Sequence, residues 1–137
     1  MANLLKVDEG FIPCPAVEND ELFRNGFFEF NITKIIDYIG ENGLVPHEIS
    51  ISDFPREFSR INESHMDSVE LGEPVILLEI APGRYNLVDG NHRMERARRE
   101  GITKIMTYRL SAEEHVKFLT RKDAYLSYVE YWNEKLE

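Results

Sequence analysis

The sequence predicts a single α/β domain of the α+β kind, with a small mixed sheet that is flanked by helices and extended at both ends. Its length of 137 residues suits one domain. An apolar content of 42%, with 15 aromatic residues, is typical of a folded globular protein. Between residues 45 and 110, segments with strand patterns alternate with segments that have helix signals, and this alternation indicates mixed architecture.

Residues 1–44 are expected to form an N-terminal extension. Residues 1–26 are turn-prone, acidic and weakly patterned, although four phenylalanines are expected in a core: Phe23, Phe27, Phe28 and Phe30. Asn31 is a suitable cap for a helix over residues 32–41, with Gly43 as its stop. The apolar face of this helix is expected to contain Ile32, Ile35, Ile36 and Ile39.

The predicted core begins with a strand at residues 47–54, where apolar and polar residues alternate. Residues 55–72 are predicted to form one or two short helices that start after Pro55. The apolar run at residues 73–81 has the length of a central strand. Pro82 and Gly83 predict a turn, and residues 84–89 the returning strand of a hairpin.

A helix over residues 91–100 is expected next, with Asn91 as its cap, Gly101 after its end, and Met94 and Ala97 on its buried side. A further strand follows at residues 103–110. Residues 111–137 are predicted to be helical, with capping signals at 111–114 and 120–123. Four apolar residues at helical spacing are expected to pack within the chain or against a second copy: Tyr125, Val129, Trp132 and Leu136.

The charge of the chain is unevenly distributed. The formal net charge is −9, but residues 84–109 hold seven basic residues against three acidic ones, so the rest of the chain carries −13. This acidic body argues against sequence-independent binding of nucleic acid, which requires many phosphates to be neutralised. It leaves room for one local anion site in the basic stretch.

The turn at residues 89–93 is the predicted anion site. A strand that ends in Asp89-Gly90 and turns directly into a helix presents backbone N–H groups and the positive end of the helix dipole to an anion. Gly90 allows close approach of a ligand, Asn91 caps the helix, and the side chains of His92 and Arg93 reach toward the same point. Arg93 and Arg96 oppose the helix dipole, and a bound anion would relieve that conflict.

An ordinary interpretation is equally open on the residues alone. Arg93, Arg96 and Arg99 can form a solvated face that pairs with Glu95, Glu100 and the acidic body. Asp89 can likewise be a turn residue that bonds the adjacent backbone. The four histidines have no metal-ligand spacing, so no zinc site is predicted, and the chain contains no Walker loop or Gly-x-Gly-x-x-Gly motif.

The segment YNLVDGNHRMERARREGITKIMTYRL, residues 85–110, resembles the nucleotide-binding core of the ParB/sulfiredoxin superfamily. The likeness lies in a strand, a Gly-x-(His/Arg)-Arg turn, a helix with the small residue Ala97, then Gly101 and a closing strand. It extends more loosely over residues 45–110, which would form a ParB/sulfiredoxin-like core. The resemblance implies that the phosphates of a nucleotide are bound by Gly90, Asn91, His92 and Arg93.

The branches of this superfamily imply different chemistry. Sulfiredoxins carry a catalytic cysteine where this chain has Asn91, so sulfinic acid reduction is not expected. Partition-type ParB proteins carry a separate DNA-binding helix-turn-helix for which the chain shows no room. The nearest likeness is to the free-serine kinase branch, whose Pro-His-Glu segment corresponds to Pro55-Arg56-Glu57. This likeness implies catalytic roles for Glu57, as a general base, and for His92.

The expected function is therefore binding of a nucleotide (ATP, ADP or CTP) or a small phosphorylated ligand, with phosphotransfer to a small molecule as the associated reaction. Mg²⁺ would be held mainly by the phosphates, with Asp89 or Glu57 helping. One alternative is a catalytically silent regulatory or protein-interaction domain that retains the fold. Another is a DNA-associated partition or nuclease-like module, which the charge disfavours. Whichever function holds, a homo-oligomer is left open as the assembly.

The expected compartment is the cytoplasm. Cys14 is the only cysteine, so an internal disulfide framework is excluded, and the first residues show no secretory signal. No apolar run approaches the ~20 residues that a membrane helix needs, and no membrane association is expected.

Overall fold

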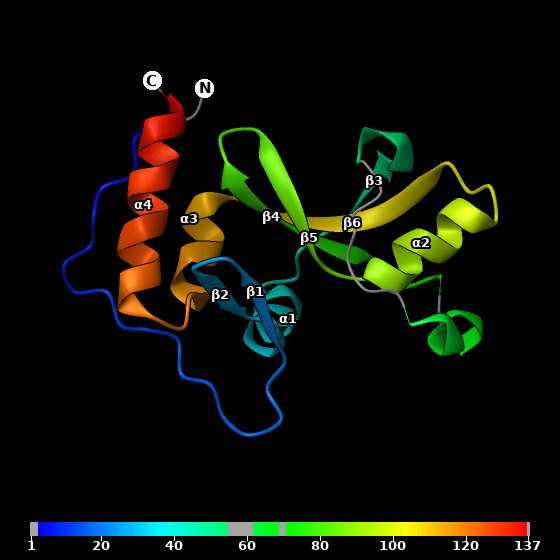
Figure 1. Cartoon of the computed structure of the whole chain (residues 1–137), viewed down its shortest axis with the longest axis horizontal. Coiled ribbons are helices and arrows are strands. Elements are labelled where there is room, and N and C mark those ends of the chain that lie inside the picture. The colour runs from blue at the N-terminus through cyan, green and yellow to red at the C-terminus, as the bar shows by residue number, and fades with distance from the viewer. Residues whose placement is uncertain (1–2, 55–61, 69–70, 137) are drawn as a thin grey trace. The chain divides into compact units, whose positions relative to one another are not determined.

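A computed structural model describes residues 3–54, 62–68 and 71–136 and confirms the α+β class (Figure 1). The chain forms two compact units. Unit 1 comprises Met1–Gly43, Leu78–Asn86 and Leu110–Glu137, and unit 2 comprises Leu44–Leu77 and Leu87–Arg109. Unit 2 thus covers most of the predicted core of residues 45–110 and adds Leu44, while residues 78–86 belong with the two terminal segments.

Unit 1 begins with a hairpin that the weak patterning of residues 1–26 did not predict. Strands β1 (Leu22–Asn25) and β2 (Phe28–Asn31) pair antiparallel around a two-residue turn in which Gly26 has φ +61°. All of β1 except Phe23 is exposed, so its sequence carries no alternation of apolar and polar residues. Phe30 is fully buried, but Phe27 is 78% exposed in the turn, and its predicted core position is wrong.

Helix α1 (Ile32–Glu41) follows directly from β2 and confirms the predicted cap. The Asn31 side chain accepts a hydrogen bond from the N–H of Lys34 at 3.1 Å. Ile32, Ile35 and Ile39 are buried. Ile36 is 46% exposed, contrary to prediction, because a helix turns 100° per residue and Ile36 lies at the edge of the buried stripe.

The C-terminal part of unit 1 contains α3 (Ala112–His115), a 3-10 helix (Val116–Phe118) and α4 (Lys122–Leu136). The capping box at Ser111 and Glu114 is confirmed. The second predicted capping signal is wrong, since the Thr120 hydroxyl donates instead to the Glu29 carboxylate at 2.5 Å and α4 begins at Lys122. The predicted stripe on α4 is buried at Tyr125, Val129 and Trp132.

A four-stranded sheet has the order β3-β6-β4-β5, and β4 and β5 contribute residues to both units. Its strands are β3 (His47–Ser50), β4 (Val75–Ala81), β5 (Arg84–Asp89) and β6 (Lys104–Leu110). As predicted, β4 is an interior strand and is buried at every position except Glu79. Strand β3 pairs antiparallel with β6 and is shorter than predicted, because the chain turns into a 3-10 helix at Ile51–Asp53.

In unit 2, helix α2 (Asn91–Arg99) follows β5 after a single glycine, as the sequence predicts. Met94 and Ala97 are each 1% exposed on its buried side. Its N-cap is Gly90, not the predicted Asn91, which is the first helical residue. Within the predicted helical segment of residues 55–72, a 3-10 helix (Glu63–Ser68) packs against α2. Residues 55–61 and 69–70 of that segment lie outside the described residues.

Gly101 ends α2 with φ +74°, as predicted. The N–H of Ile102 bonds the carbonyl of Ala97 at 2.9 Å, a typical helix-ending arrangement around a left-handed glycine. Across residues 3–54, 62–68 and 71–136, no helix combines the length and the apolar character needed to cross a membrane.

Candidate functional site

The turn between β5 and α2 requires glycine at position 90. Gly90 has φ +98°, in the left-handed region that other residues rarely adopt. A Cβ at this position would lie 2.5 Å from Cγ1 of Val75 on the adjacent strand β4. The sequence suggested that Gly90 makes room for a ligand, whereas in the structure it makes room for Val75. The close approach fixes the start of α2 against the sheet.

Arg93 holds the same turn from its other side. Its Nη2 atom lies 3.2 Å from Oδ2 of Asp89, and its Nη1 atom donates to the carbonyls of Pro74 and Glu73, the latter at 3.2 Å. The Arg93 side chain is only 14% exposed. Arg93 and Asp89 therefore form a clamp that ties the start of α2 to the residues before β4. Both charged side chains already have hydrogen-bond partners within unit 2.

This clamp has a measurable consequence for stability. We expect Arg93→Met, which keeps the length of the side chain but removes its donors, to lower the free energy of unfolding by roughly 2 kcal/mol. The carbonyl of Pro74 and the partly buried Asp89 then lose a charged partner. Urea denaturation checks this, with the exposed Arg121→Met as the matched control. Equal midpoints for the two variants would contradict the clamp.

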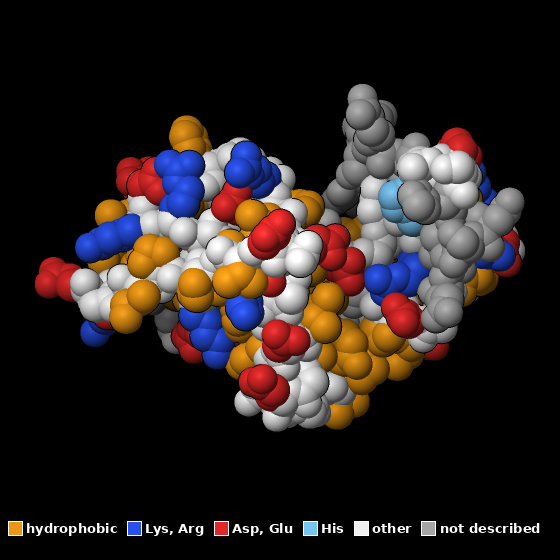
Figure 2. Space-filling model, turned by 90° about the horizontal axis from the view of Figure 1, so that it is seen from below, with side chains coloured by type: hydrophobic (Ala, Val, Ile, Leu, Met, Phe, Trp, Pro, Cys, Tyr) orange, Lys and Arg blue, Asp and Glu red, His pale blue; other side chains and the backbone are white. Residues whose placement is uncertain are grey.

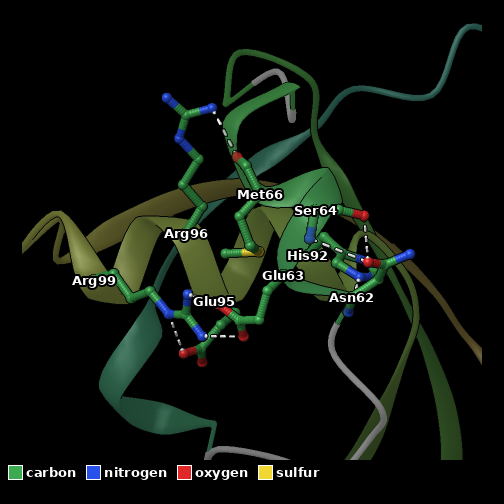
Figure 3. Close-up of polar contacts among 8 residues, drawn as sticks. All are labelled: Asn62, Glu63, Ser64, Met66, His92, Glu95, Arg96 and Arg99. Carbon is green, nitrogen blue, oxygen red and sulfur yellow. Dashed lines mark hydrogen bonds and ion pairs between the residues drawn. The ribbon is translucent and has the colours of Figure 1, made fainter.

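His92 is anchored by a main-chain contact that no local sequence pattern predicts. The N–H of Asn62 donates to Nε2 of His92 at 2.9 Å (Figure 3). Nε2 of His92 is therefore the acceptor in this contact. The side chain of Asn62 in turn accepts from the N–H of Ser64 at 3.1 Å. His92 thereby connects α2 to the beginning of the 3-10 helix at residues 63–68.

The remaining arginines of α2 also make contacts within unit 2. Nη1 of Arg96 donates to the carbonyl of Met66 at 3.0 Å, and Arg98 donates to the carbonyl of Phe54. Arg99 bonds both carboxylate oxygens of Glu63, at 2.7 and 2.8 Å, and Glu95 at 2.9 Å (Figure 3). These hydrogen bonds from Arg99 hold the pKa of Glu63 below its usual value.

These contacts bear on the interpretation of α2 as a solvated face. Two of its ion pairs are the expected ones within the helix, Arg96 with Glu100 and Arg99 with Glu95. The partner Glu63 and the carbonyls of Phe54 and Met66 were not foreseen. The arginines of α2 thus hold the segment before β4 in place.

The part of the site that can still bind an anion is the first helical turn of α2. Because its N-cap is a glycine, no cap side chain accepts hydrogen bonds from the first N–H groups of this nine-residue helix. All five residues from Asp89 to Arg93 are partly exposed. Asn91 is a polar side chain at this position for which the structure shows no side-chain hydrogen bond within the described residues. The candidate site is therefore built mainly from backbone donors and the helix dipole.

Two other predictions about the site concern Glu57 and a metal ion. Glu57 lies outside the described residues. Within the described part of the chain, no three His, Cys, Asp or Glu side chains gather as a group that could hold a metal ion.

The surface charge bears on the DNA-associated alternative. On the face drawn in Figure 2, basic and acidic side chains are interspersed and do not form one broad basic field. Duplex DNA is bound through many phosphate contacts, and the described residues on this one face offer no broad basic field for them.

Comparisons of the chain with models of known protein families, with curated proteins and with solved structures return no match.

Proposed function

We propose that unit 2 binds the phosphate group of a nucleotide at the turn from Asp89 to Arg93. The observation that carries the proposal is the left-handed glycine N-cap of α2, which leaves the first turn of the helix without a capping side chain at a partly exposed position. Backbone N–H groups and the helix dipole together favour an anion at this point. Asn91 would supply a further donor.

The likeness of residues 85–110 to the ParB/sulfiredoxin superfamily supports a nucleotide, with ATP, ADP and CTP as the candidates. In this proposal Arg93 acts mainly by holding the turn, because its guanidinium already bonds Asp89 and two carbonyls. His92 likewise positions the segment before β4 through its bond to Asn62. Mg²⁺ would enter with the nucleotide.

The variant Asn91→Glu separates anion binding from helix stability. A carboxylate in the first turn interacts favourably with the helix dipole, so we expect the free energy of unfolding to rise by about 0.5 kcal/mol. The same charge repels a phosphate, so the affinity for nucleotide should fall by roughly tenfold or more. Calorimetric titration with ATP, ADP and CTP, with and without Mg²⁺, measures the affinity, and urea denaturation measures the stability.

The matched control is Thr103→Glu, which adds the same charge to unit 2 at an exposed residue beyond the other end of α2. Its affinity for nucleotide should stay within about twofold of the native chain. Binding that Asn91→Glu and Thr103→Glu weaken equally would reflect net charge alone. Absence of binding by the native chain to any of the three nucleotides would remove the proposal.

Phosphotransfer is a separate step of the proposal, and the resemblance assigns its general base to Glu57. We expect Glu57→Gln to retain nucleotide binding and to lose transfer of the terminal phosphate to a small alcohol such as serine. Radiolabelled ATP and ADP measure the transfer. Activity that survives in Glu57→Gln would remove Glu57 from the reaction.

A further inference from the structure

Residues 3–11 of unit 1 form a segment, here called the strap, that runs alongside α4 without joining a helix or strand (Figure 1). It is attached mainly through its main chain. The side chain of Asn133 accepts from the N–H of Leu5 at 2.8 Å and donates to the carbonyl of the same residue at 3.0 Å. An amide that pairs with both main-chain groups of one residue recognises an extended peptide whatever its side chains are.

Two aromatic residues of α4 extend this pattern. The indole N–H of Trp132 donates to the carbonyl of Asn3 at 2.9 Å. The hydroxyl of Tyr125 accepts from the N–H of Asp8 at 2.7 Å. The Tyr125 ring also stacks on Phe11, with ring centroids 4.0 Å apart and planes 5° from parallel. The Tyr125 hydroxyl also donates to the carbonyl of Lys6 at 3.4 Å. Five main-chain groups of the strap are thus bonded by three side chains of α4.

The strap does not fill the surface on which it lies. Among residues 3–10, only Leu5 is partly buried, while Leu4 is 65% exposed and Val7 48% exposed. Two hollows of about 420 and 320 Å³ lie along it, and both are lined by Asn3 and Leu5 of the strap and Glu113 of α3. Little apolar surface therefore opposes release of the strap.

The chain beyond the strap is fixed independently. The N–H of Cys14 donates to the carbonyl of Leu119 at 2.9 Å, and the side chain of Asn31 donates to the carbonyl of Pro15 at 3.0 Å. Ile12, 80% exposed, lies between this anchor and the strap. The strap can therefore leave α4 without breaking the anchor at residues 14–15.

We propose that the face of α4 formed by Tyr125, Trp132 and Asn133 is an exchangeable binding surface for an extended peptide, and that its occupant in trans is the strap of a second copy of the chain. The surface is complementary to that segment in five main-chain hydrogen bonds and one ring stack. When two copies exchange their straps, every one of these contacts forms again between the copies. The free-energy cost of the exchange is therefore little more than that of association.

The first test adds a fluorescein-labelled peptide of residues 3–12 to the full chain and measures its anisotropy. The tethered strap competes at a high effective concentration, so the native chain should bind the peptide weakly. Phe11→Ala removes the stack from the tethered strap, and this variant should bind the peptide about tenfold more tightly. Phe27→Ala is the control, because Phe27 is exposed and distant in sequence from the strap. Emission of Trp132, the only tryptophan, reports on the same surface.

Peptide chemistry tests recognition through the main chain. Methylation of the amide nitrogen of Leu5 removes the donor to Asn133, and we expect binding to Phe11→Ala to weaken about tenfold or more. The same methyl group on Val7, whose N–H takes part in none of the hydrogen bonds above, is the control. Equal binding of the two methylated peptides would overturn recognition through Asn133.

The second copy is tested by mixing two variants of the full chain. Asn133→Leu has an intact strap but an impaired surface, and Phe11→Ala has an intact surface but a weakened strap. Their mixture should sediment as a one-to-one complex at concentrations where each alone is monomeric. No complex, with both variants folded by circular dichroism, would overturn the second copy as occupant. Failure of the peptide to bind Phe11→Ala would overturn the binding surface, and neither result bears on the nucleotide site of unit 2.

Discussion

Gly90→Ala should lower the free energy of unfolding by about 3 kcal/mol. A left-handed backbone costs a residue with a Cβ roughly 1–2 kcal/mol. Overpacking a buried site typically costs a further 1–3 kcal/mol, and here the new Cβ would lie 2.5 Å from Cγ1 and 2.9 Å from Cβ of Val75. Urea denaturation measures the loss.

Gly101→Ala is the matched control for this prediction. Gly101 lies at the other end of α2 with φ +74°, but a Cβ there meets no atom within 4 Å. Its variant should lose only the conformational part, about 1 kcal/mol. The double variant Gly90→Ala, Val75→Ala also shortens the side chain that the new Cβ meets. Its loss of unfolding free energy should be at least ~1 kcal/mol smaller than the sum of the losses in the two single variants. Additive losses would show that Gly90 and Val75 are not in contact.

Unit 1 should become less stable as the pH falls from 7 to 5, because of His115. This side chain is fully buried, its Nε2 donates to the carbonyl of Glu79 at 2.5 Å, and Nδ1 has no hydrogen-bond partner within the described residues. Tyr128 donates to the same carbonyl at 2.7 Å. Burial lowers the pKa of His115 from 6.5 to about 4, although the Glu79 carbonyl and the nearby Glu114 act in the opposite direction.

The sign of the effect follows from which state takes up the proton. Below pH 6.5 the unfolded chain is protonated at this residue while the folded chain stays neutral until about pH 4, so acid favours unfolding. The expected loss of unfolding free energy is about 2 kcal/mol between pH 7 and pH 5. His115→Gln, which keeps an N–H donor but does not titrate, should remove this part of the pH dependence. His47→Gln, at an exposed residue, should retain it, and identical slopes for the two variants would refute the assignment.

Much of the fold could be predicted because local signals agree with the tertiary structure. The Asn31 cap, the buried run of β4 and the left-handed Gly101 each act through residues that are adjacent in sequence. The hairpin β1–β2 could not be predicted, since its first strand is mostly exposed and therefore carries no periodicity. The 3-10 helix at residues 51–53 is closed by the bond from the N–H of Phe54 to the carbonyl of Ile51, and the alternation of apolar and polar residues over this segment did not predict it.

The strand, turn and helix of the candidate site were predicted correctly, but the contacts of its side chains were not predictable. Val75 reaches Gly90 because β4 lies beside β5 in the sheet. Asn62 and Glu63 reach His92 and Arg99 because the segment before β4 packs on α2. No local pattern marks such partners. Arg93 was therefore assigned to a ligand, whereas its first contacts are with Asp89 and the carbonyls of Glu73 and Pro74.

Backbone amide chemical shifts test the proposed phosphate site most directly. In a titration of the ¹⁵N-labelled chain with ADP, the N–H resonances of Asn91, His92 and Arg93 should move in one saturable transition. Inorganic phosphate should move the same three resonances with lower affinity, and Asn91→Glu should abolish the response to both. Saturable shifts elsewhere in the chain with none at residues 91–93, or no shifts at all, would contradict a phosphate site at the start of α2.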